Sequence, residues 1–293
     1  MNKVKNYIDI FLELAKVRIT FFVSFSTGIG YILQKGELDF NIIFPILGVF
    51  LLASGASALN HFQERKTDLL MERTKNRPIP TKKISPTGVI IFAAILVLIG
   101  SFFLIYFTNV ISLLLGLITL VWYNLIYTPL KRINALAVVP GSVIGALPPV
   151  IGWTAAGGNP FDYQAVALAL FFFIWQIPHF WLLLLIHGKD YENAGFPTLT
   201  QIFSNQQLSR ITFIWIAALV VSSFLIPVFE LNSNRISVIG LFLFGAGLLF
   251  YTRVILSNYL EKVTFRNAFF SINLYVLIVV LILSIDKLFL TEF

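Results

Sequence analysis

Three side chains that carry oxygen donors follow one another at intervals of four residues: Asn60, Glu64 and Asp68. If this segment is helical, the three lie on one helix face, because each step of four residues rotates by only about 40°. Two carboxylates and an amide oxygen suit a hard cation such as Mg²⁺, which keeps several waters and takes up phosphate oxygens. The spacing therefore predicts a magnesium site.

Basic residues follow directly. Arg73 and Arg77 are again four apart, and Lys75 lies between them. Guanidinium groups offer a phosphate two parallel hydrogen bonds, so carboxylates, a metal and arginines together describe a diphosphate site. The alternative is a basic loop at a membrane surface with a few ion pairs, and spacing alone does not separate the two. The position of Asn60 at the end of an apolar stretch favours the functional interpretation.

The composition indicates where these residues must be held. Of the 293 residues 58% are hydrophobic and only 12% are charged, whereas a soluble domain carries about 25% charged residues. Much of the surface must therefore face lipid. The chain has no Cys, which excludes disulfide frameworks, thiolate metal sites and cysteine nucleophiles.

Stretches of roughly 20 apolar residues are long enough to cross a bilayer as helices. Nine occur, and no segment alternates polar and apolar residues as a barrel strand does. The nine are 17–34, 41–62, 87–106, 109–126, 137–156, 164–186, 211–229, 236–252 and 268–289. The chain is predicted to be an all-α integral membrane protein with nine transmembrane helices in a single domain, 1–293.

The basic residues set the orientation. With nine spans, 18 of the 21 Lys and Arg residues fall on the side that holds the N-terminus, so that side is expected to be cytoplasmic. The net charge of +7 then belongs to the membrane surface, and no nucleic-acid partner is expected. The segment 1–16 has no small-residue cleavage site and is interpreted as neither a signal nor a transit peptide.

Three further motifs bear on chemistry. Tyr127 ends the fourth span, and Lys131 and Arg132 follow it; a basic pair there is more often a topology signal than a catalytic one. His179 lies inside the sixth span after Pro178, which is expected to disturb the helix. An ionisable ring within the membrane is a functional candidate by default, although a structural histidine bonded to a neighbouring helix is the competing interpretation.

The third motif begins with Asp190, Tyr191 and Glu192, shortly after the sixth predicted span. A polar patch around Asn273 in the last span is expected to make hydrogen bonds between helices.

These motifs resemble the UbiA-type intramembrane prenyltransferases. The pattern from Asn60 to Pro78 is similar to the first acidic motif of that family, with Glu64 standing where Asp is more usual. The elements 127–132 and 189–197 resemble its Tyr-Thr-x-x-Lys-Arg element and second acidic motif. The family's second motif is Asp-x-x-x-Asp, and its second position is Ala194 here, so the resemblance implies that Asp190 acts alone, with Glu192 a poor geometric substitute. Within the family, the sequence Trp-Gln-Ile-Pro-His-Phe at 175–180 resembles the heme O synthase branch.

The resemblance implies a bundle of the UbiA type whose active site opens to the cytoplasmic side. It implies roles for residues in three groups. The metal ligands would be Asn60, Glu64, Asp68 and Asp190. The diphosphate would meet Arg73, Arg77, Tyr127 and Lys131, with Lys75, Arg132 and Tyr191 nearby. The acceptor would meet His179 and Gln176.

The heme O synthase resemblance further implies transfer of a farnesyl group from farnesyl diphosphate to a vinyl group of haem B, with addition of water, giving haem O. Mg²⁺ is the expected cofactor, and a haem A synthase or the assembly of a terminal oxidase are the expected partners in a bacterial cytoplasmic membrane. Two alternatives stay open: a quinone-pathway prenyltransferase that acts on an aromatic acid, and a secondary transporter, although no internal repeat of the transporter kind is visible.

Overall fold

The computed structural model describes residues 2–231 and 234–290, and this part of the chain contains helices and no strand. Eight helical segments are long and apolar enough to cross a membrane: Phe40–Glu64, Pro86–Phe107, Val110–Leu130, Val138–Ala155, Tyr163–Asn193, Asn205–Val228, Arg235–Leu256 and Lys262–Leu290. Each coincides with one of the predicted spans, which confirms an all-helical membrane protein.

The first predicted span is the helix α2, Val17–Lys35. It is more polar than the eight, and its buried residues include Thr20, Ser24 and Thr27. It packs against α8, Val143–Ala155, at very short range. A Cβ added at Gly30 would lie 1.8 Å from the carbonyl oxygen of Pro149, and one added at Gly152 would lie 1.8 Å from that of Thr27. The small residues of the fifth span thus serve close helix contact, as helices in lipid require.

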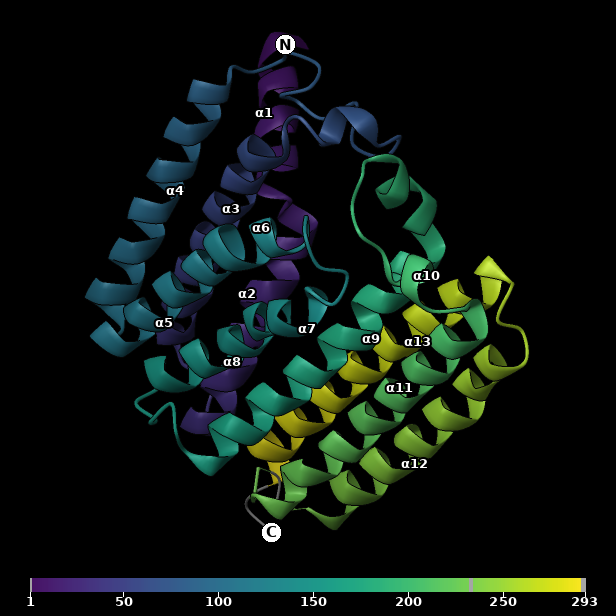
Figure 1. Cartoon of the computed structure of the whole chain (residues 1–293). Coiled ribbons are helices and arrows are strands. Elements are labelled where there is room, and N and C mark those ends of the chain that lie inside the picture. Colours follow the sequence, from purple (N-terminus) through teal and green to yellow (C-terminus); the bar gives the residue numbers. More distant parts are fainter. Residues whose placement is uncertain (1, 232–233, 291–293) are drawn as a thin grey trace.

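The remaining long helices form two neighbouring groups (Figure 1). α3, Ile43–Glu64, packs on α4, Pro86–Phe107, beside α5, Val110–Val121. α9, Tyr163–Asn193, packs on α11, Asn205–Val228, and on α13, Lys262–Ile285, with α12, Arg235–Thr252, outermost. The largest core cluster lies within the second group and includes Phe171, Leu219 and Val279.

The helix α9 is longer than predicted. It runs without interruption from Tyr163 to Asn193 with Pro178 inside it, so the expectation that Pro178 disturbs the helix is wrong. At 1.5 Å per residue its 31 residues span about 46 Å, more than the roughly 30 Å of a hydrocarbon core. The last residues of α9, which include the second acidic motif, therefore extend beyond the membrane interior.

The fourth span contains a π-helical turn, Trp122–Tyr127, between α5 and the short α6, Thr128–Leu130. Such turns inside helices are frequent at functional sites. The side chain of Asn124 fixes this turn to α3, because its amide nitrogen donates to the carbonyl oxygen of Ala56 and to the side-chain oxygen of Gln63, each at 3.0 Å. The turn therefore sets Tyr127 and Lys131 against the polar end of α3.

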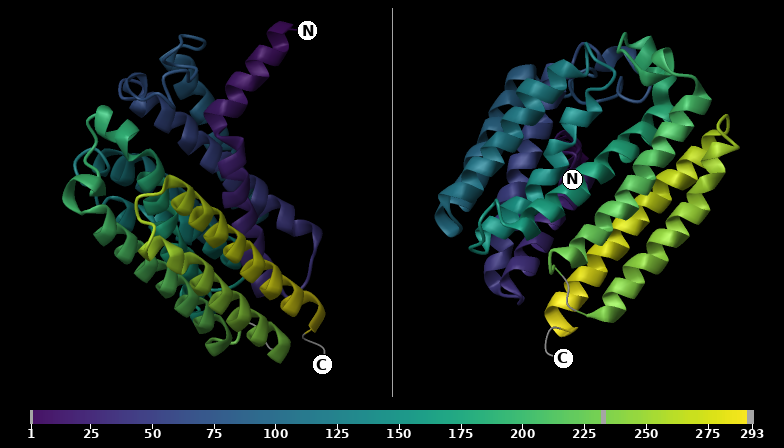
Figure 2. Two further views of the ribbon diagram at one scale, coloured as in Figure 1. Left: turned by 90° about the vertical axis from the view of Figure 1, so that its right-hand side faces the viewer. Right: turned by 60° about the horizontal axis from the view of Figure 1, so that its bottom comes forward.

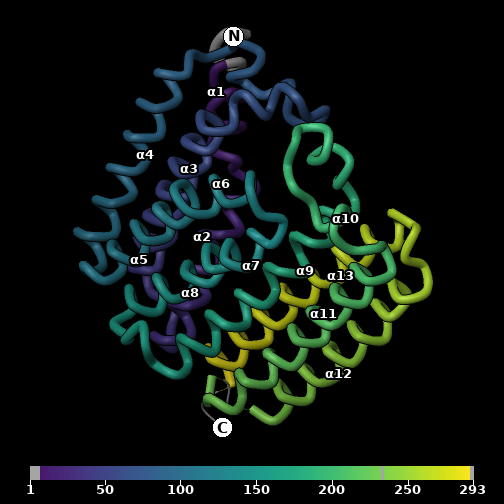
Figure 3. Tube along the Cα trace, viewed as in Figure 1, coloured from purple at the N-terminus to yellow at the C-terminus, as the bar shows by residue number. Residues whose placement is uncertain are grey.

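Two more segments complete the end of the molecule that carries the polar residues. α1, Asn2–Ala15, extends away from the bundle (Figure 2) and packs Ile10 and Leu14 against the α3–α4 pair. The loop after α3 contains a short turn, Asp68–Leu70. It lies at the same end of the molecule as the segment after α9, which contains the short helix α10, Leu199–Ile202 (Figure 3). Another short helix, α7, Val138–Gly141, leads into α8.

Candidate active site

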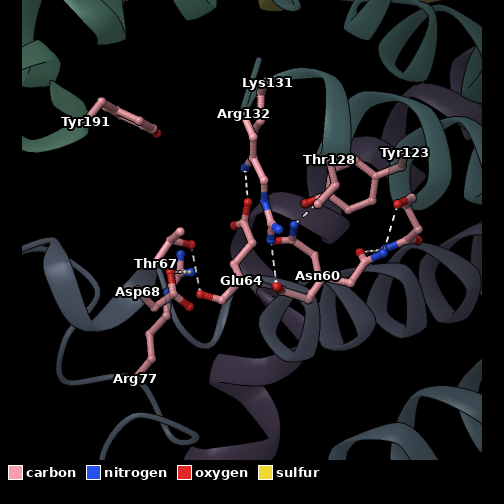
Figure 4. A network of polar contacts seen from close by, with 12 residues as sticks. Asn60, Glu64, Thr67, Asp68, Arg77, Tyr123, Thr128, Lys131, Arg132 and Tyr191 are labelled. Carbon is pink, nitrogen blue, oxygen red and sulfur yellow. Dashed lines mark hydrogen bonds and ion pairs between the residues drawn. The ribbon is translucent and has the colours of Figure 1, made fainter. Parts of the chain in front are cut away.

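The polar end of α3 is buried, and three of the four predicted ligands lie near it: Asn60 and Glu64 on the helix and Asp68 in the turn that follows (Figure 4). The Asn60 side chain joins three segments of the chain: Lys16 Nζ donates to its Oδ1 at 3.0 Å, and its Nδ2 donates to Thr128 Oγ1 at 3.2 Å. The Glu64 carboxylate, 4% exposed, forms an ion pair with Lys131. Asn60 and Glu64 are therefore each in contact with an ammonium group.

The pKa of Lys131 reflects the groups around its ammonium. Burial disfavours its ammonium group, but the Glu64 carboxylate together with the Tyr127 and Tyr191 hydroxyl groups outweighs that effect, and the pKa of Lys131 lies above its ordinary value. The next residue, Arg132, points elsewhere: its guanidinium donates to the backbone oxygen of Gln63 at 2.7 Å and is exposed.

Asp68 is fully buried and forms an ion pair with Arg77 at 2.7 Å. Only one of its oxygens is used, because Oδ2 accepts no hydrogen bond from the described residues. Burial raises the pKa of Asp68, and the Arg77 guanidinium offsets that rise only in part. An ionised Asp68 thus has a buried oxygen free for a second cation. The loop itself is held by Thr74, whose hydroxyl donates to the backbone oxygen of Asp68 at 3.0 Å.

The second acidic motif meets the first across 118 residues of sequence. The Asp190 carboxylate accepts the backbone N–H groups of Glu72 at 2.8 Å and Arg73 at 3.4 Å. The Arg73 guanidinium in turn donates to the Tyr191 hydroxyl at 3.2 Å. Asp190 and Tyr191 therefore fix the loop that carries the arginines.

Glu192 does not act as a second acid of this motif. Its carboxylate accepts hydrogen bonds from the hydroxyls of Thr198 and Thr200, at 2.8 and 2.5 Å, and so ties α9 to the following turn. Lys75 is turned toward Glu72 in an exposed ion pair at 2.5 Å.

The donor set fits a hard cation, and Asp190 is the one predicted ligand that is held apart from the others. Amide and carboxylate oxygens are the ligands that Mg²⁺ takes in proteins, and Asp68 Oδ2 has no hydrogen-bond partner in the part of the chain that the structure describes. Within residues 2–231 and 234–290, however, no three His, Cys, Asp or Glu side chains are grouped to hold a metal ion. Asp190 is thus bonded to backbone N–H groups and is not gathered with Glu64 and Asp68.

An aromatic series leads from Lys131 into the membrane. The ammonium of Lys131 lies 5.7 Å from the ring centre of Tyr127, which stacks with Tyr123 at 6.0 Å. On its other side Tyr127 lies 6.4 Å from Phe180, and Phe180 lies 5.4 Å from His179. The polar end of α3 and His179 are therefore connected by adjoining rings.

His179 is part-buried, and its Nδ1 lies 2.9 Å from Asn273 Oδ1 on α13. This bond confirms that the polar patch around Asn273 joins helices. Gln176, one turn earlier, packs against Gly145 of α8, and its Oε1 is buried without a hydrogen-bond partner among the described residues.

Two residues of the site were missed by the sequence-based assignment. Lys16 stands at the break between α1 and α2 with a left-handed backbone, φ 48° and ψ 48°; burial, reinforced by Arg77, lowers its pKa to about 7. The signal for it was the break itself, a basic residue between two apolar runs. His61 is 2% exposed with both ring nitrogens unpartnered within the described part of the chain, and nothing in its sequence context marked it out.

The model of one family, described as the UbiA prenyltransferase family, matches residues 22–274. The chain belongs to this family. The resemblance seen in the motifs is thereby confirmed, and the chain is a prenyltransferase rather than a transporter.

Curated relatives carry a more specific name. A protoheme IX farnesyltransferase of Geobacter sulfurreducens is 40% identical over 238 residues, covering 77% of this chain and 83% of the relative. One of Cytophaga hutchinsonii is 33% identical over 286 residues, covering 95% of this chain and 98% of the relative.

Solved structures share the fold. A digeranylgeranylglyceryl phosphate synthase matches with a TM-score of 0.78 at 18% identity, covering 98% of this chain and 99% of that one. A UbiA homologue of Archaeoglobus fulgidus, bound to GPP and Mg²⁺, matches with a TM-score of 0.60 at 13% identity, covering 94% and 99%. That homologue of the same fold thus binds GPP together with Mg²⁺.

Proposed function

We propose that this chain transfers the farnesyl group of farnesyl diphosphate to a vinyl group of haem B, with addition of water, and so forms haem O. The observation that carries the proposal is the joining of the two acidic motifs, in which Asp190 holds the backbone of Arg73 beside the buried Asp68–Arg77 pair. The relatives named protoheme IX farnesyltransferase support the choice of donor and acceptor.

The diphosphate end works by exchange of partners. Glu64 is paired with Lys131 and Asp68 with Arg77, so each carboxylate is neutralised by a cation of the chain. A diphosphate competes for those cations, since a guanidinium fork matches phosphate oxygens at least as well as a carboxylate. The carboxylate oxygens released in this way, with Asn60 and Asp190, would hold Mg²⁺.

The chemistry that a bound Mg²⁺ supplies is neutralisation of charge on the leaving diphosphate. Arg73, Arg77, Lys131 and Lys16 add positive charge at the same place, so the allylic C–O bond breaks with its electron pair going to the diphosphate. The farnesyl cation that remains is stabilised by the faces of Tyr123 and Tyr127. Lipid and the surrounding helices keep bulk water away from it.

The acceptor end lies deeper. The vinyl π electrons of haem B attack the allylic carbon, and a carbon–carbon bond forms. The new cation next to the porphyrin ring takes up one water molecule and loses one proton to the departing diphosphate. Atoms and charge then balance as haem B, farnesyl diphosphate and water giving haem O and diphosphate. His179 and Gln176 would position the porphyrin. Tyr191 and Arg132 would lie at the rim of the site.

We also infer a topology of nine crossings with a cytoplasmic N-terminus and a cytoplasmic opening, in one domain of residues 1–293. The 19 residues of α2 reach about 28 Å, close to the roughly 30 Å of the hydrocarbon core. The 18 basic residues on one side support this orientation in a bacterial cytoplasmic membrane. Haem O made there would pass to a haem A synthase or to a terminal oxidase under assembly.

The test is a competition between acceptors. The purified protein, in lipid nanodiscs with Mg²⁺ and farnesyl diphosphate, receives haem B and 4-hydroxybenzoate together, and the products are identified by mass spectrometry. Haem O as the only prenylated product is expected. Prenylated 4-hydroxybenzoate with unchanged haem B would assign the chain to the quinone pathway instead.

A further inference from the structure

The bond between His179 and Asn273 has a direction that the geometry fixes. Asn273 Nδ2 donates to the backbone oxygen of Phe269 at 2.5 Å. That carbonyl can only accept, so the amide must turn its NH₂ group toward Phe269 and its oxygen toward His179. An amide oxygen also only accepts, and therefore the proton between Asn273 Oδ1 and His179 Nδ1 belongs to the histidine.

The other ring nitrogen is then defined. A neutral imidazole with a proton on Nδ1 carries its lone pair on Nε2. No described residue forms a hydrogen bond with Nε2, and the ring is only part-buried. The lone pair is therefore available to a ligand.

Aromatic neighbours hold the ring in one orientation. Its centre lies 4.9 Å from that of Trp175, 4.8 Å from that of Phe269 and 5.4 Å from that of Phe180. Two of these rings come from α9 and one from α13. The imidazole thus has a fixed plane, a fixed tautomer and an apolar surrounding that suits a porphyrin.

We propose that Asn273 is a positioning residue that holds His179 as the Nδ1–H tautomer, so that Nε2 binds the iron of haem B as an axial ligand. A histidine that ligates a metal commonly donates its other N–H to an oxygen, which orients the ring and raises the basicity of the ligand. The step is the formation of one coordinate bond from the Nε2 lone pair to iron, with no change in protonation. This inference rests on haem B being the acceptor.

The distance along α9 between His179, near the middle of the helix, and Asp190, near its C-terminal end, gives this proposal its function. His179 precedes Asp190 by 11 residues of uninterrupted helix, which is a rise of about 16 Å. Ligation at Nε2 would hold the porphyrin in the membrane interior, at the inner end of the Tyr127–Phe180 series, while the diphosphate stays at the polar end. The vinyl group then meets the farnesyl carbon from the apolar side.

The first experiment needs no haem. Nitrogen NMR of the protein labelled with ¹⁵N-histidine reports the tautomer of each of its three histidines, and His179→Ala assigns the signal. We expect His179 as a single Nδ1–H tautomer, a mixture of tautomers in Asn273→Ala, and no change in His187→Ala, a control at an exposed position of the same helix. A proton on Nε2 in the unaltered protein would overturn the proposal.

The second experiment adds ferrous haem B and follows the iron–histidine stretching band by resonance Raman spectroscopy. We expect the band to be lost in His179→Gly and restored by added imidazole, and to shift to lower frequency in Asn273→Ala while Asn273→Asp restores or raises it. A band that is unchanged in His179→Gly would overturn iron ligation. Each variant must retain pyrophosphate binding, which excludes misfolding as the cause.

The two proposals fail in different ways. If the unaltered protein shows the iron–histidine band but makes no haem O from farnesyl diphosphate, the proposed function fails and the ligand assignment stands. If it makes haem O at the same rate and with the same spectrum in His179→Gly, the function stands and the ligand assignment fails.

Discussion

The C-terminal end of α9 and its middle lie in opposite surroundings. Around Asp190 and the end of α3, charged groups form ion pairs and hydrogen bonds drawn from four segments of the chain, and Asp68 Oδ2 has no hydrogen-bond partner among the described residues. Around His179, one hydrogen bond and three aromatic rings define the site. The first region is suited to a substrate with changing charge, and the second to one whose plane must be fixed. Substitutions at the first should therefore act through charge, and those at the second through orientation.

The strongest test of the charged region is Asp68→Asn, which keeps shape and removes the buried charge. Loss of a carboxylate that holds the metal and pairs with Arg77 should cost about 4 kcal/mol in the transition state, or about a thousandfold in kcat. Steady-state haem O production measures it. The control is Glu37→Gln, an exposed carboxylate outside the site, which should leave kcat unchanged. Activity within about tenfold of the unaltered enzyme would refute the metal assignment.

Lys16→Met tests whether the break between α1 and α2 belongs to the charged region. Removal of the ammonium that donates to Asn60 Oδ1 should cost about 2 kcal/mol, which is about thirtyfold in kcat/KM for farnesyl diphosphate. Haem affinity should not change. A fall in haem affinity with normal diphosphate kinetics would place Lys16 in the acceptor region instead.

Arg77→Lys keeps the charge and removes the planar fork. An ammonium cannot pair with Asp68 and meet a phosphate in the same geometry, so KM for farnesyl diphosphate should rise about tenfold. Isothermal titration with the diphosphate and with haem B separates the two substrates. If the diphosphate affinity is unaltered while haem affinity falls, Arg77 contacts the haem propionates.

Tyr191→Phe should have the smallest effect. It removes one hydrogen bond to Arg73, worth about 0.7 kcal/mol, and should raise KM for the diphosphate about threefold with kcat unchanged. A larger loss, in kcat, would mean that the hydroxyl contacts the reacting groups.

The charged region was readable in part from the sequence, because spacing by four on a helix identifies a face, and Asn60 and Glu64 do lie in the last turns of α3. The helix ends at Glu64, however, and Asp68 begins a separate 3-10 turn, so the prediction that all three share one helix face is wrong for Asp68. Spacing could not predict which residues form ion pairs and hydrogen bonds with one another. Glu64 contacts Lys131, and Asp190 contacts the backbone of Glu72, only because α9 and the π-helical turn pack against the end of α3 and its following loop.

The acceptor region around His179 was harder to predict from the sequence. His179 stood out as an ionisable ring in an apolar span, but its partner is 94 residues away, and Asn273 looked like any polar residue in a membrane helix. The continuity of α9 through Pro178 was also not predicted. A proline usually interrupts a helix, but α11 and α13 pack along α9, and these tertiary contacts outweigh the local effect of the proline.

The most direct test of the division into two regions is a paired titration. Asp68→Asn and His179→Ala, each checked for folding, are titrated with inorganic pyrophosphate in the presence of Mg²⁺ and, separately, with haem B followed through its Soret band. Asp68→Asn is predicted to lose pyrophosphate affinity by about tenfold or more and to bind haem normally, and His179→Ala is predicted to do the reverse. Loss of both ligands in either well-folded variant would contradict the account.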